Sequence, residues 1–260
     1  MIRRTLTQTQ AATFAVLLPN PRQAGMPAPV GTGFFVSPDG YFVTAAHVVH
    51  DRSGNVRGDL DQMWLDKELR GMPPVPVGVQ TAALELESAD ADIALLKFDF
   101  DANKEKDWLK DRTGFPFVEV SQRILEEGEP VYSFGYPLSR GELVQDEESL
   151  KVGGTQLSPR TTSAIIASTL ELTRMTMTHG QPPVDYVLDK ALNYGNSGGP
   201  IVATETGAAH AVCARFQPVH IPQIRGQPVM IPSLYGVATS LARPAIVGEL
   251  QKRDIQVTTV

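Results

Sequence analysis

Short apolar runs separated by turn-forming residues recur along most of the chain. The runs are rich in β-branched and aromatic residues, whereas glycine, proline, asparagine and aspartate gather between them. Runs of about four to eight residues spaced in this way are typical of antiparallel β-sandwiches and β-barrels. We therefore predict an all-β fold, with strands at residues 11–18, 75–79, 82–86, 93–98, 117–120, 130–134, 164–172, 184–188, 200–203, 211–216 and 235–240.

The clearest single element is a predicted hairpin between residues 31 and 49. An apolar run at residues 34–36 is followed by Ser-Pro-Asp-Gly at residues 37–40, and a second apolar run begins at residue 41. Serine, proline, aspartate and glycine each favour turns, so this order predicts two strands joined by a tight connection.

Helical periodicity is scarce. Residues 241–252 place apolar side chains at helical spacing, which predicts a C-terminal helix, and the charged residues 101–112 are expected to form a short surface helix. Long loops are expected at residues 139–159, 179–183 and 217–232. The last of these contains four prolines, which should prevent regular strand pairing.

Composition and charge exclude several classes of protein. The 260 residues are 42% hydrophobic and 20% charged, which is an ordinary globular composition, and the formal net charge is −6. Such a chain lacks the basic surface of a general nucleic-acid or anionic-membrane binder. No apolar stretch approaches the roughly 20 residues that a membrane span needs. The single cysteine, Cys213, permits no intrachain disulfide, so we expect a cytoplasmic location and a buried thiol.

The sharpest chemical signal is Gly-Asn-Ser-Gly-Gly-Pro at residues 195–200. Serine becomes a nucleophile only when a base holds its hydroxyl and oriented N–H groups meet the developing oxyanion. The glycines around Ser197 let the backbone turn tightly, so that the N–H groups of Gly195 and Ser197 can point at one spot. The alternative is a glycine-rich turn with a solvated serine.

Two further residues complete a catalytic set. His47 follows a predicted strand and two alanines. An imidazole can take the proton of a serine and return it to a leaving group, as a general base must. Asp92 precedes the apolar run at residues 93–98 and could fix the tautomer of that histidine. The order His, Asp, Ser is that of chymotrypsin-like proteases. A structural histidine, a capping aspartate and Asp90 as the acid are the alternatives.

These motifs resemble those of trypsin-like serine peptidases, and within them the Deg/HtrA-type bacterial branch. The similar segments are residues 31–36 with 39–49, Phe-Gly-Tyr-Pro at residues 134–137 and Asp-Lys-Ala-Leu-Asn at residues 189–193. The resemblance implies two six-stranded antiparallel barrels with the triad in the groove between them. It places the N-terminal barrel at residues 1–115, the C-terminal barrel at 116–240 and a closing helix and tail at 241–260. We find no PDZ-like segment after residue 242 and expect a form of this branch without that domain.

The resemblance also implies roles for these residues. Ser197 would attack the carbonyl, His47 would move the proton and Asp92 would orient His47. The oxyanion hole would comprise Gly195, Asn196 as the backbone bridge, and Ser197. The expected function is a serine endopeptidase acting on proteins or peptides through an acyl-enzyme, without a cofactor or metal. A peptide-binding or chaperone module and an esterase are the alternatives, and the oligomeric state is left open.

The substrate pocket is placed by the same resemblance. Its walls would come from Ala191, Leu192, Val212, Arg215, Gly236 and Ala238. Ala191 favours a small or apolar side chain before the cleaved bond. Arg215 offers an alternative, since a buried guanidinium could bind an acidic side chain in a bidentate manner. Equally, Arg215 could extend into solvent.

Overall fold

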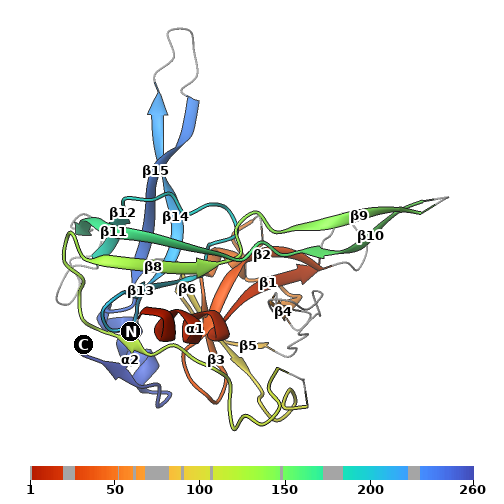
Figure 1. The fold of residues 1–260 in the computed structure, drawn as a ribbon, viewed down its shortest axis with the longest axis horizontal. Helices are drawn as coiled ribbons and strands as arrows, with labels where there is room; N and C mark the ends of the chain where they lie inside the picture. Colours follow the sequence, from red (N-terminus) through yellow and green to blue (C-terminus); the bar gives the residue numbers. More distant parts are fainter. Residues whose placement is uncertain are drawn as a thin grey trace.

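Antiparallel strands form two sheets that make up most of the molecule (Figure 1). The computed structural model describes residues 2–19, 27–51, 53–60, 63–67, 82–88, 91–105, 108–146, 149–171, 184–221 and 229–260. The first sheet contains β1 (Thr13–Pro19), β2 (Pro27–Phe35), β3 (Tyr41–Thr44), β4 (Trp64–Asp66), β5 (Ala82–Ser88) and β6 (Ile93–Phe98). The second sheet contains β7 (Val120–Ser121), β8 (Pro130–Gly135), β11 (Arg160–Glu171), β12 (Val184–Leu188), β13 (Pro200–Ala203), β14 (Ala209–Ile221), β15 (Val229–Ser240) and β16 (Val257–Thr258).

Each sheet forms one barrel. The strand order of the first barrel is β4-β1-β2-β3-β6-β5. In the second barrel, β13, β8, β11, β12, β15 and β14 follow one another, and a β13–β14 pairing closes the ring. The short strands β7 and β16 join this sheet through parallel pairings. The all-β fold is therefore confirmed, and β6, β12 and β13 have the predicted bounds.

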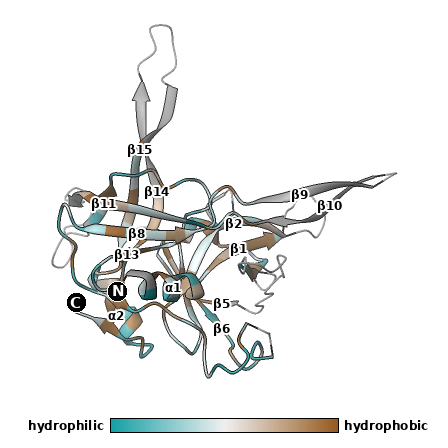
Figure 2. Ribbon diagram, viewed as in Figure 1, coloured by the Kyte–Doolittle hydropathy of each residue, from teal (hydrophilic) through white to brown (hydrophobic). Residues whose placement is uncertain are grey.

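Apolar side chains alternate between the inside of a barrel and the contact between the barrels. On β6, Leu96 and Phe98 lie in the interior of the first barrel, whereas Ile93 and Leu95 join a cluster that also contains residues of the second barrel and the C-terminal helix. This is the two-residue period of a strand. Figure 2 shows apolar residues along the strands at the centre of the molecule.

The first strand is buried on both faces, which explains its continuous apolar sequence. Phe14 and Val16 pack inside the first barrel. Ala15 and Leu17 face the other way and pack with Tyr136 of the second barrel. Because both faces are covered, no polar alternation is needed along β1.

A helix precedes this strand, so the strand predicted at residues 11–18 is present but begins two residues later. Helix α1 (Ile2–Ala12) runs directly into β1, which begins at Thr13. The buried Lys67 donates from Nζ to the carbonyls of Gln10 and Ala11 at 2.9 and 2.6 Å, and the Thr13 hydroxyl donates to the carbonyl of Thr9. These bonds satisfy carbonyls that the end of a helix leaves free. A distant side chain therefore helps to set the boundary.

The predicted C-terminal helix is present as α2 (Pro244–Gln251). Proline occupies its first turn, where a missing N–H costs no hydrogen bond. Ile246 and Leu250 bury its apolar side in the cluster between the barrels. In contrast, the predicted helix at residues 101–112 is wrong, since its described residues form turns. There the Asp99 carboxylate accepts the main-chain N–H groups that follow it, which favours a turn over a helix.

Two long ribbons replace predicted loops. β9 (Arg140–Asp146) and β10 (Ser149–Gln156) pair only with each other, and β14 and β15 continue as a pair beyond the second barrel (Figure 1). Pro218 and Pro232 face each other in the second ribbon. A two-stranded ribbon tolerates proline because each strand has an open edge, where the missing N–H breaks no ladder bond. The loop expected at residues 179–183 and the strand expected at 75–79 lie outside the described residues.

His210 is a buried titratable residue in the wall of the second barrel. Its Nδ1 donates to the Arg123 carbonyl at 2.9 Å, while Nε2 is buried without a hydrogen-bond partner among the described residues. Burial lowers the pKa of His210, with the Arg123 carbonyl and the Glu129 carboxylate opposing the change and the Arg123 charge adding to it. The ring is therefore neutral in the folded protein near neutral pH.

We expect His210 to make stability fall as the pH drops below about 6.5, the pKa of an unperturbed histidine. Below that pH the unfolded chain binds a proton at His210 that the folded chain does not bind. The free energy of unfolding therefore falls by up to about 1.4 kcal/mol for each pH unit. Thermal unfolding between pH 7.5 and 5 measures this slope. The His210→Asn variant keeps a donor for the Arg123 carbonyl and should show a flatter profile; an unchanged slope would contradict the assignment.

One further observation concerns membranes. Among the helices in the described part of the chain, none combines the length and apolar character needed to cross a bilayer.

Candidate active site

His47 lies in the turn that follows β3, at the edge of the first barrel. A short 3-10 helix, η1 (Ala46–Val48), carries it. Ala45 and Ala46 are buried, and their small side chains let this turn pack against the barrel. The side chain of His47 is 47% exposed and thus open to a ligand.

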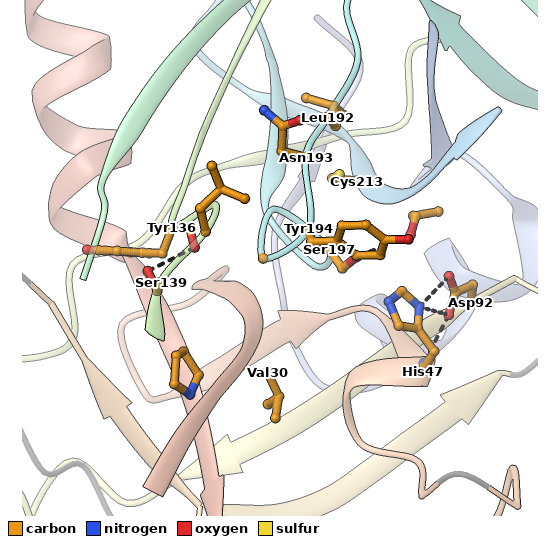
Figure 3. Close-up of a pocket in the computed structure, with 14 residues that line it drawn as sticks. Val30, His47, Asp92, Tyr136, Ser139, Leu192, Asn193, Tyr194, Ser197 and Cys213 are labelled. Atoms are coloured by element: carbon orange, nitrogen blue, oxygen red, sulfur yellow. Dashed lines mark hydrogen bonds and ion pairs between the residues drawn. The ribbon is translucent and has the colours of Figure 1, made fainter. Parts of the chain in front are cut away.

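Asp92 directly precedes β6 and orients His47. Its Oδ2 lies 2.9 Å from Nδ1 of the His47 ring, and its Oδ1 accepts the main-chain N–H of His47 at 3.0 Å (Figure 3). In the neutral ring these contacts keep the proton on Nδ1 and leave Nε2 as the basic nitrogen. Asp92 has a φ of +50°, a conformation that non-glycine residues rarely adopt and that clusters at functional sites.

Ser197 is held in a tight turn that β2 and β14 fix from two sides. Gly195 and Gly198 have φ values of +95° and +88°, which glycine adopts without a steric cost. The Gly198 N–H donates to the Cys213 carbonyl at 2.7 Å, and the Thr32 N–H donates to the Ser197 carbonyl at 2.8 Å. The turn is therefore anchored to both barrels, with Ser197 in the groove between them.

The hydroxyl of Ser197 donates to the carbonyl of Ala214 at 3.4 Å. In the described part of the chain, no hydrogen bond joins this hydroxyl to the His47 ring. Ala214 is unpaired in a β-bulge between Cys213 and Arg215, where the register against β15 shifts. Bulges turn groups out of a ladder, often beside active sites. A change in the χ1 rotamer would release the hydroxyl into the cavity that His47 also lines.

Gly195 lines this cavity, and the peptide before it is held in place. The carbonyl of Tyr194 accepts the N–H of Leu138 at 2.9 Å. In a trans peptide the C=O and the following N–H point in opposite directions, so the Gly195 N–H points away from the Leu138 N–H. The N–H of Asn196 instead donates to the Asn193 carbonyl at 3.0 Å, which makes Asn196 the bridge between the two candidate donors, Gly195 and Ser197.

A cavity of about 460 Å³ lies in front of these groups. Its walls come from both barrels and from the segment between β8 and β9. His47 and Asp92 are the ionisable groups of its wall on the first barrel, and apolar side chains predominate elsewhere. The lining residues are Pro29, Val30, His47, Asp92, Tyr136, Leu138, Ser139, Leu192, Asn193, Tyr194, Gly195, Ser197, Cys213 and Ala214.

Only some of the residues predicted for the substrate pocket lie at the cavity. Leu192 lines the cavity, and Gly236 lies directly behind it, since a Cβ built on Gly236 would sit 3.0 Å from Leu192 Cγ. Val212 instead belongs to the apolar cluster between the barrels, and its neighbour Cys213 lines the cavity.

The remaining pocket residues lie apart from the lining. Ala238 pairs with Cys213 and is buried in the second barrel. Ala191 is not among the residues that line the cavity. The side chain of Arg215 lies outside the described part of the structure.

Cys213 borders the cavity but is not a second nucleophile. Burial raises the pKa of its thiol, and the nearby Asp92 carboxylate raises it further. The thiol therefore stays protonated at physiological pH and behaves as a small apolar group. This agrees with the buried strand position predicted for it.

Other candidate residues lie elsewhere. His50 forms an isolated bridge with Val56, and His210 lies in the wall of the second barrel. Asp90, the alternative acid, lies outside the described residues. Within the described ranges, no group of three metal-ligating side chains is present.

Several cavity residues escaped the sequence analysis. Tyr194 directly precedes Gly195, and its 71% exposure beside the cavity could have been suspected from that position. Tyr136 belongs to the Phe-Gly-Tyr-Pro motif, but Tyr136 and Leu138 come to line the cavity beside Ser197 only through tertiary structure. Pro29 and Val30 belong to β2, opposite the turn.

The chain is similar to known proteins over most of its length. The family model of the trypsin-like peptidase domain matches residues 31–212. Human serine protease HTRA4 is 27% identical over 179 residues, which are 68% of this chain and 28% of that protein.

Solved structures share the fold. An HtrA-type protease, AlgW with a tripeptide, has a TM-score of 0.54 at 18% identity, over 98% of this chain and 64% of that one. A serine endoprotease from Yersinia pestis has a TM-score of 0.54 at 17% identity, over 98% and 66%. This chain thus spans 28% of the human relative and just under two thirds of each solved chain.

Proposed function

The chain belongs to the trypsin-like peptidase domain family, and on that basis we propose that it is a serine endopeptidase. One observation carries the proposal. The Asp92–His47 pair, joined at 2.9 Å, opens onto the same cavity as Ser197 and Gly195. This arrangement supplies an acid, a base, a nucleophile and an oxyanion donor together, as peptide-bond hydrolysis by serine requires.

In the proposed reaction, Ser197 Oγ leaves the Ala214 carbonyl and transfers its proton to Nε2 of His47. The oxygen bonds to the substrate carbonyl carbon, and the N–H groups of Gly195 and Ser197 receive the oxyanion. His47 then gives the proton to the leaving amine as the C–N bond breaks, which leaves an acyl-enzyme. Water, deprotonated by His47, attacks the acyl carbon. The bond between that carbon and Ser197 Oγ then breaks as His47 returns the proton to Oγ, which releases the acid product.

We propose a small or apolar side chain before the cleaved bond. Leu192, Cys213 and Ala214 give the wall of the cavity nearest to Ser197 an apolar character. An apolar wall cannot compensate the desolvation of a Lys or Arg side chain. The acidic preference that Arg215 would confer remains the alternative. The cytoplasmic location expected from the single cysteine also remains a proposal.

Incubation with denatured casein and with a fluorophosphonate probe tests this function. We expect casein to be cleaved, mainly after apolar residues, and the probe to add to Ser197 as located by mass spectrometry. Heat-unfolded protein is the control, because labelling must depend on the folded site. Intact casein together with an unlabelled Ser197 would favour the peptide-binding alternative, and cleavage after Lys or Arg would defeat both specificity proposals.

A further inference from the structure

Thr32 is a fully buried residue of the first barrel. It contacts the turn at residues 195–198 of the second barrel, which carries Ser197 and is called the nucleophile turn below. It lies on β2 between two glycines and has 0% exposure. Its hydroxyl lies 2.5 Å from the Gly195 carbonyl and 3.1 Å from the main-chain nitrogen of Tyr136. Its main-chain N–H donates to the Ser197 carbonyl. One residue of the first barrel thus holds the two residues that supply the candidate oxyanion donors.

The direction of the hydroxyl proton is determined by its two neighbours. The Tyr136 nitrogen can only donate, so the Thr32 oxygen accepts that bond. The hydroxyl proton is therefore free for the Gly195 carbonyl, which can only accept. Both partners are main-chain groups, so a side chain of the same shape without the hydroxyl would leave neither bond in place.

Without these hydrogen bonds, the backbone of Gly195 would be free to rotate. As a glycine at a φ of +95°, it has access to several backbone conformations. The Leu138 N–H holds the peptide before Gly195, and the Thr32 hydroxyl holds the peptide after it. If these bonds were lost, the backbone at Gly195 could rotate and its N–H would lose a fixed direction.

We propose that the Thr32 hydroxyl is a positioning group that keeps the Gly195 N–H aimed at the oxyanion. This inference rests on the proposed function. Thr32 does not touch the substrate, and its effect passes through the Gly195–Asn196 peptide. Because Thr32 belongs to the first barrel, the oxyanion hole of the second barrel is complete only when the two barrels are docked.

The Thr32→Val and Thr32→Ser variants test the proposal. Valine keeps the shape but removes the hydroxyl, whereas serine keeps the hydroxyl. Removing an oxyanion donor costs about 10²–10³-fold in kcat, so misaligning one should cost about 10–100-fold. We expect this loss in Thr32→Val with KM changed less than about 3-fold, and near-normal kcat in Thr32→Ser. A peptide boronate mimics the tetrahedral intermediate, so the affinity of the variant for it should fall in parallel with kcat.

The Thr9→Val variant is the matched control. Thr9 is also buried, and its hydroxyl also has two hydrogen-bond partners, the Thr5 carbonyl and the Tyr132 hydroxyl, but it does not line the cavity. Its loss should lower the melting temperature without changing kcat or boronate affinity. If Thr32→Val does not fold, Thr32→Ala, which also removes the hydroxyl, takes its place in the test, with the same kcat loss expected.

The outcomes separate this inference from the function on which it rests. If the wild-type protein neither cleaves casein nor reacts with the fluorophosphonate, that result would contradict the proposed function. Active wild-type protein with kcat and boronate affinity unchanged in Thr32→Val or Thr32→Ala would overturn the role of Thr32 alone. The same holds if Thr9→Val lowers kcat as much as Thr32→Val, or if Thr32→Ser fails to restore it.

Discussion

The Ser197→Ala variant should lose turnover by a factor on the order of 10⁶ and should no longer react with a fluorophosphonate. Alanine removes the oxygen that forms the covalent bond, and neither His47 nor the oxyanion donors can replace it. The thiol of Cys213 cannot act instead, because burial raises its pKa and keeps it protonated. Casein hydrolysis and gel-based probe labelling measure the two losses.

This substitution should leave the fold intact. The Ser197 hydroxyl makes a single long bond of 3.4 Å, and the anchoring bond to Thr32 uses the main-chain carbonyl, which alanine keeps. The melting temperature should therefore match that of the wild type. Ser133→Ala, in the wall of the second barrel, serves as a control that should label normally. Labelling that survives in Ser197→Ala would show that another residue is the nucleophile.

The Asp92→Asn variant should reduce kcat by a factor on the order of 10⁴. Oδ1 of Asp92 accepts the main-chain N–H of His47, and Oδ2 lies 2.9 Å from the ring Nδ1. Oδ1 also lies 3.0 Å from Nδ1, so both carboxylate oxygens contact the ring, and asparagine replaces one of them with an NH₂ group. The main-chain N–H would hold the remaining oxygen, so the NH₂ group would take the place of Oδ2 beside Nδ1. The ring would then carry its proton on Nε2, where it cannot accept one from Ser197.

The Asp92→Asn variant should affect proton transfer without affecting the stability of the fold. Asparagine tolerates the φ of +50° at this position, so stability should change little. Steady-state kinetics with a peptide substrate should show the loss in kcat, with KM nearly unchanged. Asp39→Asn, which removes the charge that pairs with Lys97 at the surface, is the matched control and should retain activity. An Asp92→Asn enzyme with near-normal kcat would favour another acid.

The sequence was most informative where local pattern and packing coincide. The apolar run at residues 93–98 became β6 with the predicted bounds, because alternate residues there face two separate cores. It was least informative where distant groups decide the outcome. The end of α1 depends on Lys67, which lies more than fifty residues away. The ribbon of β9 and β10 lies where the sequence predicts a loop, and in the described part of the chain its two strands pair with each other and not with a barrel strand.

The all-β class and the three residues of the candidate triad could be predicted without a structure. Strand alternation is a local property, and Ser197, His47 and Asp92 each lie in a short motif whose residue types suit one reaction. How these groups meet depends on tertiary packing. The bulge at Ala214 arises from the pairing of β14 with β15, and the bonds from Thr32 to the turn that carries Ser197 arise where the two barrels dock. Contacts between segments so far apart in the chain depend on three-dimensional packing, which no local pattern records.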